Sequence, residues 1–297
     1  PRAGTTLLMR LLFASGSFAS LTYRDMPFVL SPNLWRKMSR RSHHAGELKP
    51  RAHGDRLLVN ADSPEALEEV FWRVHCRDQY IDADGLRTMQ AGRSVMEKFG
   101  VYVKLVALSQ GKRRYLSKNN NNILRLESLR KAFPTATILV PFRHPGDQAL
   151  SLLQQHQRFV DMHRDSPFSR EYMGWLVHHE FGSDHRPFKW GGSDDCSAAP
   201  SEPAYWLNQW HRAYRALLDM AGVLELKFVS YEALCANPGS AWELLGAELG
   251  LQPGLPLAEA VFPPVKPANR VDVERETLDL YHALAEHSLT KSLIAAT

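Results

Sequence analysis

Strand-like and helix-like segments alternate through the middle of the chain, and this alternation limits the fold more than any other feature. Residues 113–119 (RRYLSKN) and 136–143 (ATILVPFR) have the character of short strands. Residues 122–132 and 146–161 have the character of helices. Strand, helix, strand and helix in succession are typical of a parallel sheet covered by helices, so the sequence predicts an α/β fold.

Size and composition fit one globular domain, expected over residues 1–297, with 44% hydrophobic and 23% charged residues. The formal charge of +4 favours anionic ligands weakly and predicts no nucleic-acid partner. The three cysteines, Cys76, Cys196 and Cys235, lack metal-ligand spacing and read as free thiols, which favours a cytoplasmic protein without a metal. We find no apolar run long enough for a membrane span.

The first six residues, PRAGTT, combine a glycine and two hydroxyls with the start of a helix. Leucines at positions 7, 8, 11 and 12 have helical spacing, so a helix is expected over residues 5–15. Gly4 lets backbone N–H groups approach an anion at the helix N-terminus. The lysine that a nucleoside-triphosphate loop carries before its Ser or Thr is absent, which disfavours a triphosphate ligand.

PRAGTTLL resembles the 5′-phosphosulfate loop of sulfotransferases that use PAPS (3′-phosphoadenosine 5′-phosphosulfate). FPTATILVPFRHPGDQALSLL is similar to the 3′-phosphate segment of that family, with Ser151 eight residues after Arg143. FVSYEALCANPG resembles a further family segment and implies that Tyr231 lies near the adenine. The resemblance implies PAPS as co-substrate, PAP as product, and these cofactor-binding residues: Arg2, Ala3, Gly4, Thr5, Thr6, Leu7, Arg143, Ser151 and Tyr231.

The same resemblance implies a P-loop-like fold of three layers, in which helices flank a parallel central sheet. It also implies a parallel strand directly before Pro1, which this chain does not contain. Residues 159–203 interrupt the strand–helix alternation and are expected to form a substrate-facing insertion or lid. Earlier in the chain, Ser63 and Pro64 have the character of a helix start.

Sulfuryl transfer requires charge stabilisation and a proton acceptor. The resemblance assigns charge stabilisation to Arg2 and Lys118, with Asn119 as a weaker candidate, although Lys-Asn-Asn replaces the usual Lys-Asp-Pro or Lys-Thr-Pro of the family. Relatives with arginine in the loop use an acidic base about twenty residues later, which implies Asp25 as the catalytic base. Arg24 is a plausible ion-pair partner of Asp25, and His53 and His144 are alternative bases.

The acceptor is expected to be a small molecule, a glycan or a peptide. The basic stretch 36–56 offers charges for an acidic acceptor, but such runs are more often solvated loops. Trp175 and Trp190 offer rings for stacking, whereas Trp206 and Trp210 have the spacing of core residues on one helix. Two alternative functions stay open: a P-loop kinase that uses ATP and magnesium, and a nucleotide-binding protein without catalytic activity.

Overall fold

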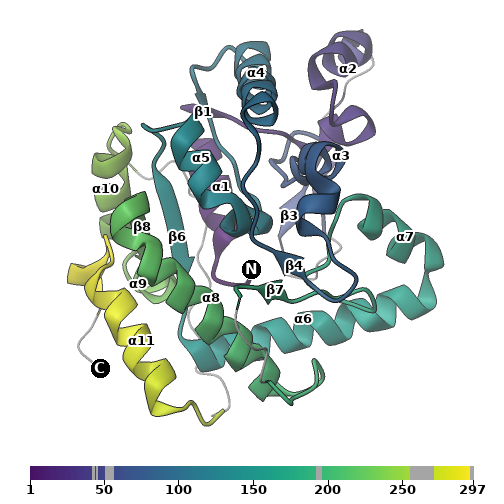
Figure 1. Ribbon diagram of the computed structural model, residues 1–297. Coiled ribbons are helices and arrows are strands. Elements are labelled where there is room, and N and C mark those ends of the chain that lie inside the picture. Colours follow the sequence, from purple (N-terminus) through teal and green to yellow (C-terminus); the bar gives the residue numbers. More distant parts are fainter. Residues whose placement is uncertain (42–43, 45, 51–56, 192–195, 255–270, 295–297) are drawn as a thin grey trace.

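The computed structural model describes residues 1–41, 44, 46–50, 57–191, 196–254 and 271–294 (Figure 1). The helices are α1 Thr5–Ala14, α2 Pro32–Met38, α3 Glu69–Tyr80, α4 Arg93–Ser109, α5 Leu126–Ala132, α6 Pro145–Asp165, α7 Pro167–Trp175, α8 Pro203–Leu224, α9 Tyr231–Ala236, α10 Pro238–Leu249 and α11 Arg275–Glu286. The strands are β1 Phe18–Ala19, β2 Lys49–Pro50, β3 Leu58–Val59, β4 Leu86–Arg87, β5 Arg114–Tyr115, β6 Ile138–Phe142, β7 Phe188–Lys189 and β8 Leu226–Ser230. Short 3₁₀ helices are η1 Tyr23–Phe28, η2 Ser39–Arg41, η3 Asn120–Arg125 and η4 Lys291–Leu293.

The strands form four separate pairs. The pairs β1–β5, β4–β7 and β6–β8 are parallel, and β2–β3 is antiparallel. The α/β class with parallel strands flanked by helices is therefore confirmed. The sequence predicted one continuous central sheet. In the part of the chain that the structure describes, the parallel strands form separate pairs instead. Residues of both β5 and β6 line a large cavity.

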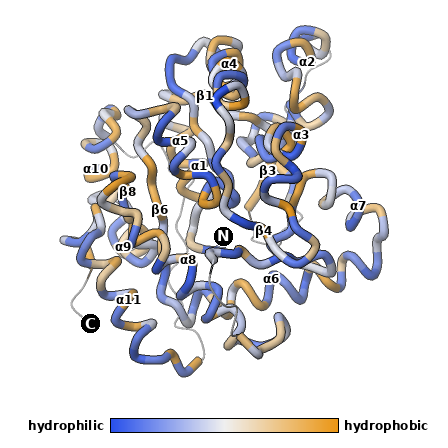
Figure 2. The backbone as a smooth tube through the Cα atoms, in the orientation of Figure 1, coloured by the Kyte–Doolittle hydropathy of each residue, from blue (hydrophilic) through white to orange (hydrophobic). Residues whose placement is uncertain are grey.

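The β6–β8 pair lies between two helical layers because its side chains alternate between its two faces. Val140, Phe142 and Phe228 belong to a core cluster with residues of α8 and α11. Leu139 and Val229 pack in a different cluster, with residues of α1, α9 and α10. Figure 2 shows β6 as a mostly hydrophobic strand, as its burial requires. Because the two strands are parallel and packed between these layers, their carboxyl ends lie at the same edge of the pair.

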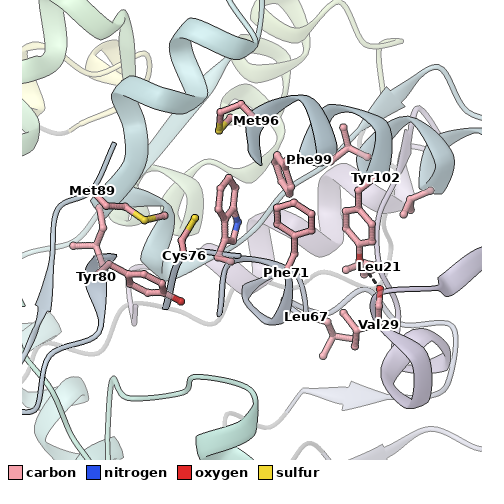
Figure 3. Close-up of a cluster of buried hydrophobic side chains, with 14 of the residues drawn as sticks. Leu21, Val29, Leu67, Phe71, Cys76, Tyr80, Met89, Met96, Phe99 and Tyr102 are labelled. Atoms are coloured by element: carbon pink, nitrogen blue, oxygen red, sulfur yellow. Dashed lines mark hydrogen bonds between the residues drawn. The ribbon is translucent and has the colours of Figure 1, made fainter. Parts of the chain in front are cut away.

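A further core cluster joins α3 to α4 and contains five buried aromatic side chains: Phe71, Trp72, Tyr80, Phe99 and Tyr102. Figure 3 shows Phe71 of α3 beside Phe99 and Tyr102 of α4, and the ring centroids of Phe71 and Phe99 are 5.2 Å apart. The Tyr102 hydroxyl donates a 2.7 Å hydrogen bond to the backbone oxygen of Val29, so its polar end is satisfied inside the core. This cluster anchors α3, at whose start lie two buried glutamates, Glu68 directly before the helix and Glu69 as its first residue.

Two segments differ from the sequence-based expectations. The region 159–203 begins inside α6 and includes α7, whose amphipathic character was not recognised. The helix expected from Ser63 starts instead at Glu69, because Pro64 forms a β-bridge with Thr22 and the Glu65 N–H donates to the Leu21 carbonyl. These long-range contacts override the local helix signal. Among the described helices, none has both the length and the apolar character that a membrane span requires.

Candidate active site

The register of β6 and β8 brings two predicted cofactor-binding residues together. Phe142 is paired with Ser230, so Arg143 and Tyr231 both follow directly at the carboxyl ends of their strands. The guanidinium carbon of Arg143 lies 4.9 Å from the centre of the Tyr231 ring, a cation–π contact. Ligands of parallel α/β folds bind at this end of the strands. The two residues were predicted separately, and the fold places them side by side.

The loop before α1 has an unusual backbone. Gly4 has a φ of 78° and Arg2 a φ of 66°, both in the left-handed region. A Cβ atom at Gly4 would lie 2.6 Å from Cδ2 of Tyr231, so glycine is needed both for the backbone angle and for space. No side chain caps the start of α1, whose first turn is formed by Thr5, Thr6 and Leu7. The N-terminal N–H groups of α1 are therefore available to an anion.

Arg2 and Ser151 connect this loop to α6. Nε of Arg2 donates a 2.9 Å hydrogen bond to the Ser151 hydroxyl. One turn earlier on α6, the Gln148 amide donates a 2.8 Å hydrogen bond to the Pro1 carbonyl. Ala3, the next residue of the loop, is buried. The structure thus brings the loop at residues 1–4, Arg143, Ser151 and Tyr231 into one site.

The described residues satisfy the polar groups of the Arg143 side chain only in part. Its Nη2 lies 3.8 Å from a carboxylate oxygen of Asp147, in the first turn of α6. Its Nε is buried and has no hydrogen-bond partner among the described residues. An unsatisfied buried N–H on a guanidinium is costly, and an anion oxygen would satisfy it. This N–H group is therefore a candidate donor to an anion bound at the site.

Lys118 lies at a large cavity next to this loop. The cavity has a volume of about 780 Å³, and Thr5 of α1 also lines it. Its polar part includes Lys118, Asn120, Glu180, His185 and Arg186. The rest of its lining is mostly apolar and comes from α1, α4, α5, α8 and the strands β5 and β6. Lys118 and the first turn of α1 thus share one cavity.

The four asparagines after Lys118 fix the loop geometry that the sequence left in doubt. Asn119 caps η3 by accepting a hydrogen bond from the Asn121 N–H, and its side-chain amide donates to Glu69. Glu69 also accepts two hydrogen bonds from the buried Arg125, at 2.8 and 2.9 Å. The Asn122 amide donates to Glu68, which in turn accepts from the hydroxyl groups of Ser117 and Tyr115. Neither glutamate was predicted from the sequence. The asparagine run was the one available signal, because its amide groups need acceptors such as these carboxylates.

Asp25 does not lie in this cavity. Its carboxylate is fully buried and accepts hydrogen bonds from the N–H and the hydroxyl of Thr22, in a capping box at η1. Two further bonds come from Arg36, at 2.6 and 2.5 Å. The expected partner Arg24 points instead toward the Arg36 carbonyl and Ser39. These contacts give Asp25 a structural role outside the cavity, and its assignment as the base stays a prediction.

The remaining predicted residues lie in different surroundings. His144 precedes α6, and its ring packs against Tyr281, 5.4 Å away between ring centroids. His53 lies outside the described residues. Trp206 and Trp210 are buried in the core, as their spacing predicted. Trp175 is half-exposed at the end of α7, and Trp190 packs beside Phe188, with 6.1 Å between the ring centroids.

Two ionisable groups in the cavity were not predicted from the sequence. Glu180 accepts a 2.9 Å hydrogen bond from the Asn120 amide and lies 3.5 Å from Nδ1 of His178. Burial raises the pKa of Glu180, but the contacts with His178 and Asn120 together lower it by more. The net pKa of Glu180 is therefore well below the usual range. Burial lowers the pKa of His185 to about 4. Glu180 is therefore an anion and His185 a neutral imidazole at neutral pH.

Both nitrogens of His185 are engaged. Nδ1 lies 3.1 Å from the His179 carbonyl, to which it donates, and Nε2 lies 2.8 Å from the Tyr205 hydroxyl, from which it accepts. A carboxylate has more acceptor positions than the two that Glu180 uses here. Glu180 therefore keeps capacity to accept a further hydrogen bond, and His185 does not.

No group of three or more metal-ligating side chains occurs in the described parts of the chain.

A comparison with curated proteins finds no match. Among solved structures, the chain is similar to the sulfotransferase domain from the curacin biosynthetic pathway, with 14% identity, a TM-score of 0.42, and coverage of 96% of this chain and 94% of that domain. The family model described as "Sulfotransferase family" matches residues 1–169, which is more than half of the chain and includes the loop, Lys118, Arg143 and Ser151. The chain belongs to the sulfotransferase family.

Proposed function

We propose that this protein transfers a sulfuryl group from PAPS to a hydroxyl or amine of an acceptor and releases PAP. The observation that carries the proposal is the buried Nε of Arg143, which has no partner among the described residues and lies beside the PRAGTT loop. A guanidinium with an unsatisfied N–H suits the 3′-phosphate that distinguishes PAPS from an ordinary adenine nucleotide. The coarser statement, membership in the sulfotransferase family, rests on the family match.

The residues present fit this co-substrate. Arg143 and Ser151 would bind the 3′-phosphate, and the N–H groups of Thr5, Thr6 and Leu7 would bind the 5′-phosphosulfate at the start of α1. The Tyr231 ring supports both Gly4 and Arg143, and in this proposal its remaining surface contacts the adenine. Arg2 links the two phosphate sites through its hydrogen bond to Ser151.

PAPS supplies the sulfuryl group when bound: a bond from sulfur to the acceptor oxygen or nitrogen forms while the bond from sulfur to the phosphate oxygen breaks. Lys118 and the α1 N-terminus stabilise the negative charge that develops on that phosphate oxygen. The acceptor proton goes to a base. We assign this step to the Glu180 carboxylate, which lines the same cavity as Lys118 and Thr5.

Calorimetric titration with PAP tests the donor assignment. We expect the wild type to bind PAP, and we expect Arg143→Ala to lose at least about tenfold in affinity, because a charge-assisted hydrogen bond contributes about 1.5–3 kcal/mol. Arg158→Ala is the matched control, since Arg158 is an exposed arginine of the same helix, α6. Equal PAP affinity of the wild type and Arg143→Ala would exclude the 3′-phosphate assignment.

Two further measurements address the alternative functions. A P-loop kinase would bind ATP in a magnesium-dependent way and would not bind PAP. A binding protein without catalysis would bind PAP and PAPS but would transfer no label from radiolabelled PAPS to any acceptor. Binding of PAP together with label transfer supports the proposed function.

A further inference from the structure

A second cavity, of about 450 Å³, lies between α3 and α7. These two helices are far apart in the sequence, and residues of both line this cavity. The guanidinium of Arg73 joins them by donating a 2.7 Å hydrogen bond to the Trp175 carbonyl. The mostly hydrophilic character of α7 is visible in Figure 2. The cavity is thus formed jointly by α3, α7 and the chain after α7.

Positive charge dominates the lining of this cavity. Arginines come from three elements: Arg73 and Arg77 from α3, Arg170 from α7, and Arg186 from the segment before β7. Arg170 is neutralised by Asp184, with contacts of 2.7 and 2.6 Å, and Glu171 is the other acidic group in the lining. Two arginine charges therefore exceed the acidic ones.

The exposed Arg77 guanidinium has no hydrogen bond or ion pair with another described residue. The Trp175 ring, 47% exposed, stands at the same cavity as these cations. Guanidinium groups bind carboxylate and sulfate oxygens in a planar, bidentate way, and an indole ring packs against the rest of such a ligand. The chemistry of the lining is that of an anion site with one aromatic wall.

The second cavity is connected to the active site through Arg186, which lines both. His185, the neighbouring residue in the chain, lines the larger cavity beside Lys118 and Glu180. His179 lines the second cavity, and burial lowers its pKa, an effect that the nearby Arg186 increases. Residues of the segment 179–187 therefore border both cavities, and Arg186 contributes to the lining of each.

We infer that this second cavity is an acceptor subsite that binds a carboxylate or sulfate group of an anionic acceptor, whose nucleophilic hydroxyl or amine reaches the larger cavity past Arg186. This inference rests on the proposed function, because it assigns the acceptor of the same reaction. It assigns anion recognition to α3 and the region 167–187, whereas the sequence offered the basic stretch 36–56 as one candidate and a solvated loop as the commoner interpretation. It also gives the predicted substrate-facing insertion a chemical task.

Two pairs of probes test the subsite by calorimetry, each pair matched in its sugar skeleton and different in charge. Trigalacturonate and its methyl ester test a carboxylate, and sucrose octasulfate and sucrose test a sulfate. The titrations are carried out with and without saturating PAP, so that occupation of the donor site by the probe is detected. The variants are Arg77→Gln and Arg186→Gln, and Arg158→Gln is the control for the loss of one exposed charge.

We expect at least one charged probe to bind in the presence of PAP, and its neutral partner not to bind. We expect Arg77→Gln and Arg186→Gln each to weaken that binding about tenfold, and Arg158→Gln to leave it within about twofold. Equal weakening in all three variants, or no binding of either charged probe, would overturn the subsite. If the probe binds as expected but PAP does not bind at all, the donor assignment fails while the anion site stands.

Discussion

The guanidinium of Arg143 lies over the ring of Tyr231, 4.9 Å from its centre. These residues are 88 positions apart and meet because β6 and β8 are paired in parallel and end in register. Tyr231 also contacts Gly4, so one aromatic ring holds both the arginine and the loop. The proposed donor site therefore depends on a side chain that contacts both of its halves.

Replacing this ring is expected to weaken PAP binding without destroying the fold. A cation–π contact contributes about 1 kcal/mol, so Tyr231→Leu should raise the Kd for PAP about fivefold. Tyr231→Phe keeps the ring and should stay within about twofold. Calorimetry on the three proteins checks this, and an equal loss in both variants would show that the hydroxyl, rather than the ring, is the important part.

Gly4→Ala is expected to abolish measurable PAP binding. The new Cβ would lie 2.6 Å from Cδ2 of Tyr231, at a φ of 78°, so the loop has to move. Left-handed strain alone costs about 1–2 kcal/mol. Gly111→Ala is the control, because Gly111 has a φ of 64° and no atom within 4 Å of the new Cβ. It should lose stability in urea unfolding and keep its PAP affinity, which separates backbone strain from the collision with Tyr231.

Asp25 and Glu180 should behave in opposite ways. Asp25→Asn removes the buried ion pair with Arg36 and should lower the free energy of unfolding by about 2 kcal/mol or more, with kcat of the folded protein nearly unchanged. Glu180→Gln should lower kcat about a hundredfold or more and leave the Kd for PAP within about threefold. Label transfer from PAPS and calorimetry give both readings. A hundredfold fall in kcat for Asp25→Asn alone would return the role of base to Asp25.

The Glu69–Arg125 pair is expected to be a main support of the loop that carries Lys118. Their side chains are 4% and 0% exposed, and the Tyr80 hydroxyl donates to the same carboxylate. Glu69→Gln leaves the Arg125 charge buried and should cost about 3–5 kcal/mol in urea unfolding. Glu97→Gln, which breaks the exposed pair with Arg93, should change stability by less than about 1 kcal/mol. Similar effects of both changes would contradict the role given to the buried pair.

Stability should fall in mild acid because His185 is buried in its neutral form. Its pKa is about 4 in the folded protein and about 6.5 in the unfolded chain. Between these values the unfolded chain binds a proton that the folded protein does not, so stability decreases as the pH falls from 6.5 to 4, by about 3 kcal/mol at most. His185→Gln should reduce this slope in urea unfolding between pH 7 and 5. His287→Gln, at an exposed position, should leave the slope as it is.

Local patterns in the sequence were sufficient for most of the elements around the site. The leucine spacing after Thr6 predicted α1, the apolar run before Arg143 predicted β6, and the Trp-rich segment predicted α8. Ser63 shows the limit of such patterns, since a good local helix signal gave way to pairing with the Thr22 segment. Helical period and β-propensity are local properties, whereas strand pairing between distant segments depends on the whole packing.

The sequence by itself determined the donor motifs, because a glycine before a helix and an arginine after a strand have fixed consequences for the backbone and for charge. Only the tertiary structure decided which residues share a cavity. It placed Arg36 against Asp25, brought Glu180 to Lys118, and joined α3 to α7 around a positively charged cavity. These pairings depend on strand register and on helix packing across long stretches of chain, and no local pattern records them.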